Sequence, residues 1–263
     1  MRPPVLVLHA PGTNRDREAA LAVAAAGGDA TIRTLTELSD QPSDLLAYRM
    51  IVVPGGFSFG DDLGAGKVFA LELETRFGDV VREFLSHKRP VLGICNGFQA
   101  LVKAGILPGT HAPRGPRTTT LTRNARAHFE CRWVRLLPNP ASPCVFTRAL
   151  TEPIACVVAH GEGRVMFADE ATRADVKARD LGALRYERTP AAPNADDDGY
   201  PGNPNGSTDD WAGLTNADGT ALGLMPHAED HIFPHQHPTF HRGGGGESGL
   251  ALFQEGIRYA ASL

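Results

Sequence analysis

Apolar runs alternate with amphipathic stretches through the first hundred residues of this chain. Apolar runs closed by glycine or proline at residues 5–8, 50–53 and 90–94 predict buried strands, because such runs are typical of strands covered on both faces. Residues 30–35 predict a further strand. Between them, apolar residues at helical spacing predict a helix capped by Asn14, a second over residues 68–86 and a third over residues 97–104. This alternation predicts an α/β fold with a mostly parallel central sheet and helices on both faces.

The pattern changes in the second part of the chain. Residues 118–122, 130–136 and 154–159 are β-rich without clear helices between them, which favours an antiparallel extension. Residues 171–210 are polar and too many for a simple loop, so we expect a helix over residues 171–181 and then an irregular excursion. A strand over residues 221–225 and a final helix capped by Ser248 follow. Because no repeat or long linker divides the chain, we expect one domain over residues 1–263.

Composition excludes several classes of protein. The net charge of −4 argues against a protein held by charge on nucleic acid or on a membrane surface. The apolar run near the N-terminus is too short for a signal peptide, and no stretch approaches the ~20 apolar residues of a membrane span. The four cysteines contain no CxxC pair, so we expect free thiols. These features together predict a cytoplasmic protein.

One cysteine lies in a context typical of a nucleophile. Residues 91–99 read VLGICNGFQ, in which a buried strand leads through Gly-x-Cys-x-Gly into a helix. A lone cysteine is more often a small buried residue, but the flanking glycines and the strand–turn–helix context favour a nucleophile elbow at Cys95. The positive end of the following helix favours a thiolate, and the N–H of Asn96 is placed to stabilise an oxyanion.

A base and its orienting group are available after the strand at residues 221–225. His227 and Glu229 are two residues apart, so in an extended chain their side chains project to the same side. Glu229 would then hold the imidazole while its other ring nitrogen faces Cys95. The sequence therefore predicts a triad of Cys95, His227 and Glu229.

A histidine-rich segment presents an alternative to this assignment. His231, His235, His237 and His241 follow His227 closely, and two pairs have the i, i+4 spacing of helical metal ligands. Prolines interrupt any helix that would align them, and no cysteine joins them. We therefore expect a solvated loop for these four histidines and no metal site.

Five motifs give the chain a family resemblance. They are PGGFSFGDDLGAG at residues 54–66, GICNGFQ at 93–99, AHGEGR at 159–164, NPNGS at 203–207 and GLMPHAE at 223–229. Together they resemble the class I (triad) glutamine amidotransferases, and among these the PurQ family of glutaminase subunits of phosphoribosylformylglycinamidine synthase. The Cys and His-x-Glu motifs suit several amidotransferases, whereas their combination with the other three is much more specific.

This resemblance implies a flavodoxin-like fold and hydrolysis of glutamine to glutamate and ammonia. The ammonia would pass to a synthetase subunit of the PurL type, with a small bridging subunit of the PurS type as a further candidate partner. That synthetase converts formylglycinamide ribonucleotide (FGAR) to its amidine (FGAM) in de novo purine synthesis. ATP and magnesium are expected on the partner and no cofactor in this chain, which has no GxxxxGK[ST] loop.

The resemblance also implies roles for residues around the predicted triad. Gly56 and Asn96 would supply oxyanion N–H groups. The residues implied to bind glutamine are Gly55, Phe57, Gln99, Asn124 and Phe129. His160 and Glu162 of the HGEG motif either contact the partner, close the site or cap a turn.

The chain departs from the family pattern at several places. Ala228 and Asp230 replace the usual proline and arginine of PHPER, while the histidine and glutamate are kept, and Gly64 stands where arginine is usual. Residues 171–210 and 231–247 are predicted insertions relative to shorter members. Two other functions stay open: an amidotransferase that serves another synthetase, and a catalytically silent scaffold subunit.

Overall fold

A parallel five-stranded arrangement forms one half of the central sheet. The computed structural model describes residues 2–109, 116–188 and 199–263. The parallel strands are β1 (Pro4–His9), β2 (Asp29–Thr34), β3 (Met50–Val53), β4 (Val91–Ile94) and β11 (Ala221–Leu224). They lie in the order β2-β1-β3-β4-β11, which is the flavodoxin-like order of a doubly wound sheet.

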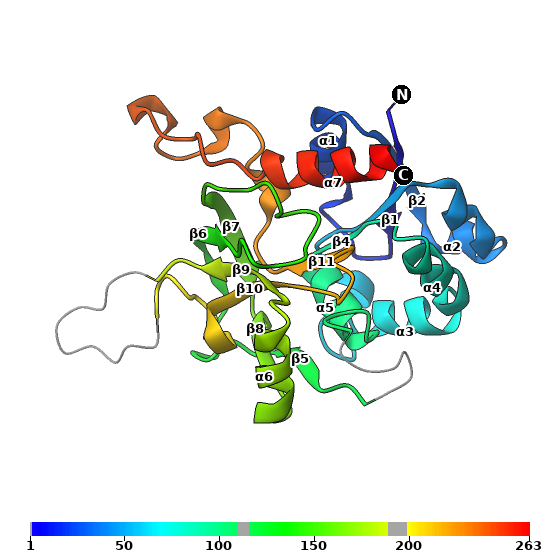
Figure 1. Cartoon of the computed structure of the whole chain (residues 1–263), viewed down its shortest axis with the longest axis horizontal. Coiled ribbons are helices and arrows are strands. Elements are labelled where there is room, and N and C mark those ends of the chain that lie inside the picture. The colour runs from blue at the N-terminus through cyan, green and yellow to red at the C-terminus, as the bar shows by residue number, and fades with distance from the viewer. Residues whose placement is uncertain (1, 110–115, 189–198) are drawn as a thin grey trace.

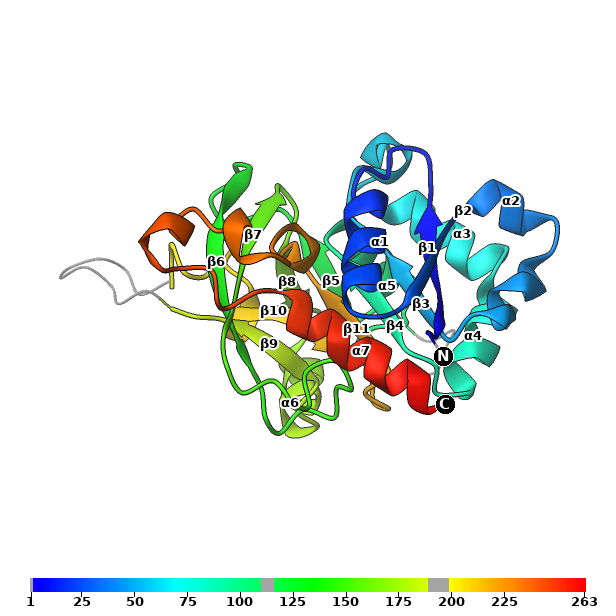
Figure 2. The same cartoon turned by 90° about the horizontal axis from the view of Figure 1, so that it is seen from above.

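The same sheet continues as an antiparallel half. Next to β11 follow β10 (Trp211–Thr215), β9 (Gly182–Tyr186), β6 (Glu130–Pro138) and β7 (Ile154–His160), so that nine strands form one sheet. A separate two-stranded ribbon joins β5 (Thr119–Thr122) to β8 (Arg164–Phe167). Figures 1 and 2 show the parallel half and the β-rich half side by side. The predicted α/β fold with an antiparallel extension is therefore confirmed.

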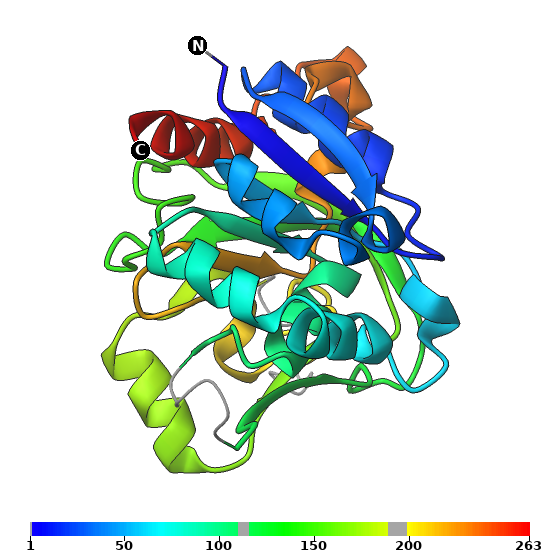
Figure 3. The same ribbon diagram turned by 90° about the vertical axis from the view of Figure 1, so that its right-hand side faces the viewer.

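Helices cover both faces of the parallel half. In Figure 3, α1 (Asp16–Ala25) and α7 (Leu250–Ser262) lie on one face, while α3 (Lys67–Thr75) and α4 (Gly78–Ser86) lie on the other together with α5 (Asn96–Lys103). Two further helices are α2 (Leu35–Ser39) and α6 (Glu170–Ala178). In the described ranges, no helix combines the length and apolarity needed to cross a membrane.

Helix termini differ from the sequence predictions. Neither Asn14 nor Ser248 caps a helix, because α1 begins after Arg15 and α7 after Gly249, and neither residue makes a side-chain capping bond. The backbone N–H of Asn14 instead donates to Gly55 O. This tertiary contact ties the turn after β1 to the loop after β3.

The single helix predicted over residues 68–86 is also wrong. The chain breaks into α3 and α4 at Phe77, whose side chain is almost fully buried, and Gly78 starts the second helix. Leu71, which a continuous apolar stripe would bury, is 51% exposed. The break redirects α4 so that Val80, Val81 and Phe84 face the core.

The polar segment 171–210 contains more regular structure than predicted. The helix expected at its start is present as α6, but β9 follows it and pairs with both β10 and β6. The excursion's acidic run, Asp196 to Asp198, lies outside the described residues. β9 was missed because its stability comes from strands distant in sequence. Short 3-10 turns complete the chain: η1 (Pro42–Ala47), η2 (Ser58–Asp61), η3 (Thr208–Asp210), η4 (Ala228–Asp230), η5 (Pro234–Gln236) and η6 (Phe240–Arg242).

Candidate active site

Three neighbouring parallel strands deliver the predicted catalytic groups to one edge of the sheet. β3 is followed by Gly55, β4 by Cys95, and β11 by His227. Because β4 pairs with β3 on one side and with β11 on the other, the three strands end together. The N–H of Cys95 donates to Leu224 O at 2.8 Å, which extends the pairing to the nucleophile itself. The carboxyl edge of such a sheet is where α/β proteins bind ligands.

Cys95 occupies a strained turn between β4 and α5. Its φ of 51° and ψ of −106° lie outside the conformations that non-glycine residues prefer, as expected for a nucleophile elbow. A Cβ on Gly97 would fall 1.9 Å from Val53 O, and one on Gly93 would fall 2.9 Å from Gly97 O. The two glycines therefore let α5 approach β3 and β4 closely. The thiol is nearly buried, and its Sγ lies 3.9 Å from Ala159 O.

His227 and Glu229 form a buried pair. Nδ1 of His227 lies 2.7 Å from Oε1 of Glu229, and both residues are less than 5% exposed. The two-residue spacing predicted side chains that project from an extended strand. Instead, they meet across the 3-10 turn η4. The backbone N–H of His227 donates to Val157 O at 2.8 Å, so the edge strand β7 holds the base in place.

Electrostatics favour a protonated His227. Burial opposes protonation of the imidazole, but the carboxylate of Glu229 and the hydrogen bond with Cys95 outweigh burial and hold the pKa of His227 well above its usual value. Among the described residues, Oε2 of Glu229 has no hydrogen-bond partner. The buried carboxylate thus relies on the imidazolium for compensation.

Gly55 and Gly56 bring backbone against the two reactive side chains. A Cβ on Gly55 would lie 2.7 Å from Cε1 of His227 and 3.4 Å from Cβ of Cys95. Gly56 has a φ of 143° and packs on the turn after β1, where its Cβ would meet Gly12 O at 2.8 Å. Phe57 N–H donates to Gly12 O at 3.0 Å, which fixes this loop.

The side chain of Asn96 fixes the same loop from the other side. Its Oδ1 accepts from the N–H of Ser58 at 3.2 Å, and its Nδ2 donates to Asp61 at 3.0 Å. Gly56 and Asn96, the two predicted oxyanion donors, therefore lie on segments that are bonded to each other.

The residues predicted to bind glutamine divide into two groups. Gln99 and Asn124 are buried, and both amides already bond to protein groups: Gln99 to Glu162 O and Asn96, Asn124 to the carbonyls of His128 and His160. Phe57 and Phe129 are 50% and 52% exposed. The first pair is fixed by bonds within the protein, and the second lies at the surface.

The HGEG and NPNGS motifs meet in a buried polar network that the sequence did not predict. Asn205 donates to Gly163 O at 2.9 Å and to the Tyr186 hydroxyl at 3.2 Å, and its Oδ1 accepts from the Ser207 hydroxyl at 2.7 Å. His160 Nε2 lies 3.5 Å from Asn205 Nδ2. The only sequence signal for this network is the joint presence of the two motifs, because neither makes an apolar pattern.

Glu162 links this network to the loop after β3. Its carboxylate accepts from the N–H of Ala65 at 3.4 Å, and its carbonyl accepts from Gln99. The HGEG turn therefore contacts both the loop that carries Gly56 and the helix that follows Cys95. The roles predicted for the motif, contact with the partner, closure of the site or capping of a turn, stay predictions.

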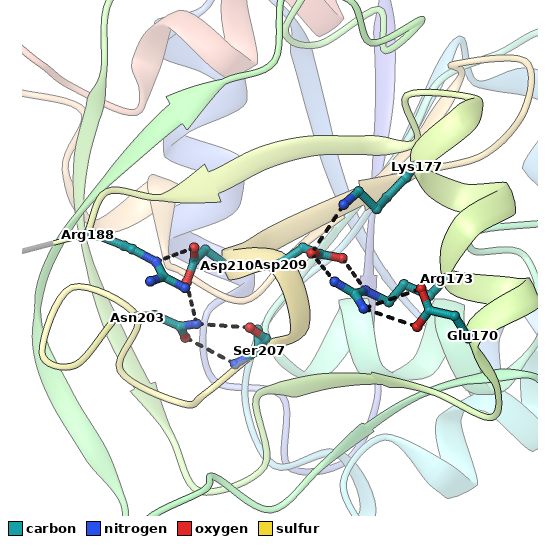
Figure 4. Close-up of polar contacts among 8 residues, drawn as sticks. All are labelled: Glu170, Arg173, Lys177, Arg188, Asn203, Ser207, Asp209 and Asp210. Carbon is teal, nitrogen blue, oxygen red and sulfur yellow. Dashed lines mark hydrogen bonds and ion pairs between the residues drawn. The ribbon is translucent and has the colours of Figure 1, made fainter. Parts of the chain in front are cut away.

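Ion pairs fasten the NPNGS loop to the outer elements (Figure 4). Arg173 on α6 makes a two-pronged contact with Asp209, at 2.7 Å and 2.8 Å, and Arg188 contacts Asp210 at 2.6 Å. Asn203 donates to both Ser207 O and Asp210 at 2.9 Å. These contacts hold the loop whose Asn205 faces His160.

The histidine-rich segment is not uniformly solvated. His231 is fully buried, its ring lies 5.2 Å from that of Trp133, and its Nδ1 contacts Ala155 O, so the predicted solvated loop is wrong for this residue. Packing against Trp133 on β6 contributes burial that the local sequence did not reveal. In the described part of the chain, no group of three His, Cys, Asp or Glu residues could hold a metal ion.

The remaining cysteines offer no second nucleophile context. All four cysteines are free thiols, as predicted. Cys144 and Cys156 are fully buried, and burial raises the pKa of both thiols. Cys131 is exposed on β6.

Comparisons with known proteins agree with this geometry. The model of the CobB/CobQ-like glutamine amidotransferase domain matches residues 2–260. The phosphoribosylformylglycinamidine synthase subunit PurQ of Treponema denticola is 43% identical over 242 residues, covering 88% of this chain and 89% of that protein. The PurQ subunit of Dehalococcoides mccartyi is 38% identical over 265 residues, covering 98% of each chain.

A solved structure extends the similarity to three dimensions. A chain in the structure of PurLQS from Thermotoga maritima superposes with a TM-score of 0.72 at 30% identity, covering 98% of this chain and 99% of that one. The domain match, the sequence relatives and this superposition span nearly the whole chain. The chain therefore belongs to the PurQ family of glutamine amidotransferase subunits.

Proposed function

We propose that this chain is the glutaminase subunit of a phosphoribosylformylglycinamidine synthase and that Cys95 is its nucleophile. The observation that carries the proposal is the convergence of three strand ends on one thiol. Cys95 lies in a strained turn beside His227, which Glu229 holds at 2.7 Å, and a glycine backbone lies against both reactive side chains.

The arrangement supports a two-step hydrolysis. The Cys95 thiolate attacks the side-chain amide carbon of glutamine, and the N–H groups of Gly56 and Asn96 stabilise the oxyanion. The tetrahedral adduct collapses to a thioester when the amide nitrogen takes a proton from the His227 imidazolium and leaves as ammonia. His227 then removes a proton from water, which attacks the thioester, releases glutamate and restores the thiolate.

Glutamine is held by residues around this thiol. Gly55 and Phe57 come from the loop after β3, while Gln99 and Asn124 shape the walls of the site and Phe129 lies at its rim. The side-chain amides of Gln99 and Asn124 are already bonded within the protein. We therefore propose that these two residues act on glutamine indirectly, by positioning the backbone groups that bind it.

Ammonia serves a separate synthetase subunit. The solved relative is part of PurLQS from Thermotoga maritima, and we propose partners of the PurL and PurS types for this chain. The partner would bind ATP and magnesium and convert FGAR to FGAM. Four free thiols support a cytoplasmic location. The continuous sheet supports one domain over residues 1–263. The insertions at residues 171–210 and 231–247 stay predictions, and β9 within the first of them belongs to the central sheet.

Replacing Cys95 tests the proposal. In the complex with its synthetase, Cys95→Ala is expected to abolish FGAM formation from glutamine and to leave formation from ammonium salts at the parent rate. The control is Cys131→Ser, which alters an exposed thiol and should retain both activities. Equal loss with both nitrogen sources would refute the role of Cys95.

The same assay separates the two other functions. If the chain serves a synthetase with another acceptor, it would hydrolyse glutamine and supply ammonia to that synthetase, and FGAR would not be converted. A scaffold subunit would support ammonia-dependent synthesis without any glutamine hydrolysis, and a glutamine-analogue diazo-ketone would not label Cys95.

A further inference from the structure

A second buried histidine lies beside the proposed base. His160 is the last residue of β7 and is 3% exposed. Burial together with the nearby His227 lowers the pKa of His160 to about 3. Its imidazole is therefore neutral throughout the physiological pH range, whereas that of His227 is protonated.

Two asparagines contact the ring of His160, one at each ring nitrogen. Nδ1 lies 3.3 Å from Oδ1 of Asn124, and Nε2 lies 3.5 Å from Nδ2 of Asn205. Asn124 Oδ1 accepts from Nδ1–H. The two hydrogens of the Asn205 amide are shared among Gly163 O, the Tyr186 hydroxyl and Nε2. Because the amide nitrogen of Asn205 cannot accept, this pair selects the neutral tautomer with its proton on Nδ1. If the ring were an imidazolium, the N–H on Nε2 would point at the amide nitrogen of Asn205, which cannot accept a hydrogen bond.

Backbone contacts fix the orientation of both amides. Asn124 accepts from the N–H of Gly163 at 3.0 Å and donates to His160 O at 2.8 Å. Asn205 accepts from the N–H of Ser207 at 3.0 Å and donates to Gly163 O at 2.9 Å. Neither amide can flip without losing backbone bonds, so the neutral state of the ring is built into the fold.

The strand end that His160 anchors touches each part of the reactive site. Along β7, Val157 O accepts from the N–H of His227, and Ala159 O contacts Sγ of Cys95. Just beyond it, Glu162 O accepts from Gln99. A displacement of this strand end would therefore move the base and the nucleophile relative to each other.

We propose that His160 is a positioning residue for glutamine hydrolysis: clamped between Asn124 and Asn205, its uncharged ring fixes the end of β7 against Cys95 and His227. It adds no positive charge beside the base. The titratable groups that face His227 are otherwise Cys95, Glu229 and Asp230. This inference rests on the proposed hydrolysis of glutamine.

Two substitutions separate positioning from simple packing. His160→Leu removes both ring contacts, whereas His160→Gln keeps an uncharged donor and acceptor. In the complex with the synthetase, the leucine variant is expected to lower kcat for glutamine hydrolysis about 100-fold with KM within about 3-fold, since small misplacements of reacting groups carry such losses. The glutamine variant should recover kcat to within about 10-fold of the parent. Ammonia-dependent synthesis should stay unchanged in both.

A second readout follows the thiol directly. Alkylation of Cys95 by iodoacetamide is measured from pH 5 to 9 in a Cys131→Ser background, so that the exposed thiol does not react. A loosened contact between Cys95 and His227 should shift half-maximal alkylation of the leucine variant to higher pH, and the glutamine variant should follow the parent. If His160→Leu does not fold, His160→Asn, which can reach only one of the two amides, should show a smaller shift in the same direction.

The outcomes are distinguishable from failure of the proposed function. Parent kcat and a parent alkylation profile in His160→Leu would overturn the inference, as would an equal loss of ammonia-dependent synthesis. If the parent complex hydrolyses no glutamine, the proposed function fails, and the alkylation profiles still decide whether His160 positions the thiol.

Discussion

Single atoms decide the geometry around Cys95. Gly55 shows this most directly, because a methyl group there would overlap the ring of His227 and touch the side chain of Cys95. A PGG sequence alone predicts only a tight turn. In the folded protein, the absence of a side chain at Gly55 leaves room for His227 to lie beside Cys95.

Gly55→Ala tests this close approach. The added Cβ would lie 2.7 Å from Cε1 of His227, so the ring must move, and kcat for glutamine hydrolysis is expected to fall about 100-fold. Steady-state kinetics of the complex measures the loss. Gly246→Ala is the matched control, since a Cβ there meets nothing within 4 Å, and it should keep parent activity. A fully active Gly55→Ala variant would contradict the assigned geometry.

At the scale of elements, the site depends on the attachment of the NPNGS loop to α6. Asp209 follows that loop and has a φ of 53°, in the left-handed region that is uncommon for non-glycine residues but in which aspartate is enriched. Arg173 on α6 makes paired contacts with its carboxylate (Figure 4). The helix thus braces a loop whose other residues hold His160.

Asp209→Asn tests this brace. The hydrogen bonds from Arg173 lower the pKa of Asp209, so its contribution to stability is present above the unfolded pKa near 4 and is lost as pH falls through the lower folded value. Because the pair is partly exposed, we expect a loss of about 1 kcal/mol at pH 7.

Chemical denaturation at pH 7 and pH 3 measures the effect, and the difference between variant and parent should shrink at the lower pH. Glu170→Gln removes a carboxylate that is 75% exposed and should change stability by less than about 0.5 kcal/mol. A difference for Asp209→Asn that does not depend on pH would contradict the role of its charge.

At the scale of the whole molecule, the β-rich half brings the HGEG turn against the loop after β3. Exposed apolar side chains lie in these segments, with Leu63 at 73% and Phe57 at 50% in the loop and Phe129 at 52% before β6. The loop and the HGEG turn are joined by the contact of Ala65 with Glu162. A surface of this kind suits a protein partner that receives ammonia from the site.

Leu63→Asp tests this surface. A charge at so exposed a side chain should leave the fold intact and weaken association with the synthetase subunit about 10-fold, because it disfavours burial in an apolar interface. Analytical ultracentrifugation or calorimetry of the two purified subunits measures the affinity. Leu21→Asp on α1, where the leucine is 51% exposed, should bind as the parent does. Equal weakening by both changes would place the interface elsewhere.

The sequence by itself determined the parallel half of the fold and the chemistry at its edge. Buried strands such as residues 50–53 and the strand–Cys–helix unit around Cys95 are encoded in contiguous residues, and the motifs around them identify the family. Local patterns suffice there because the inner parallel strands β3 and β4 are apolar throughout and the glycines around Cys95 lie beside it in the sequence, whereas the edge strand β2 is polar and partly exposed.

Only the tertiary structure decided the rest. β9 and the burial of His231 depend on pairing or packing partners far along the chain, so no local period predicts them. The polar clamp joins Asn124, His160 and Asn205, which have no common pattern in the sequence. Such networks form only when the fold excludes water and each buried polar group must find a partner, and this constraint explains why the state of His160 was invisible in the sequence.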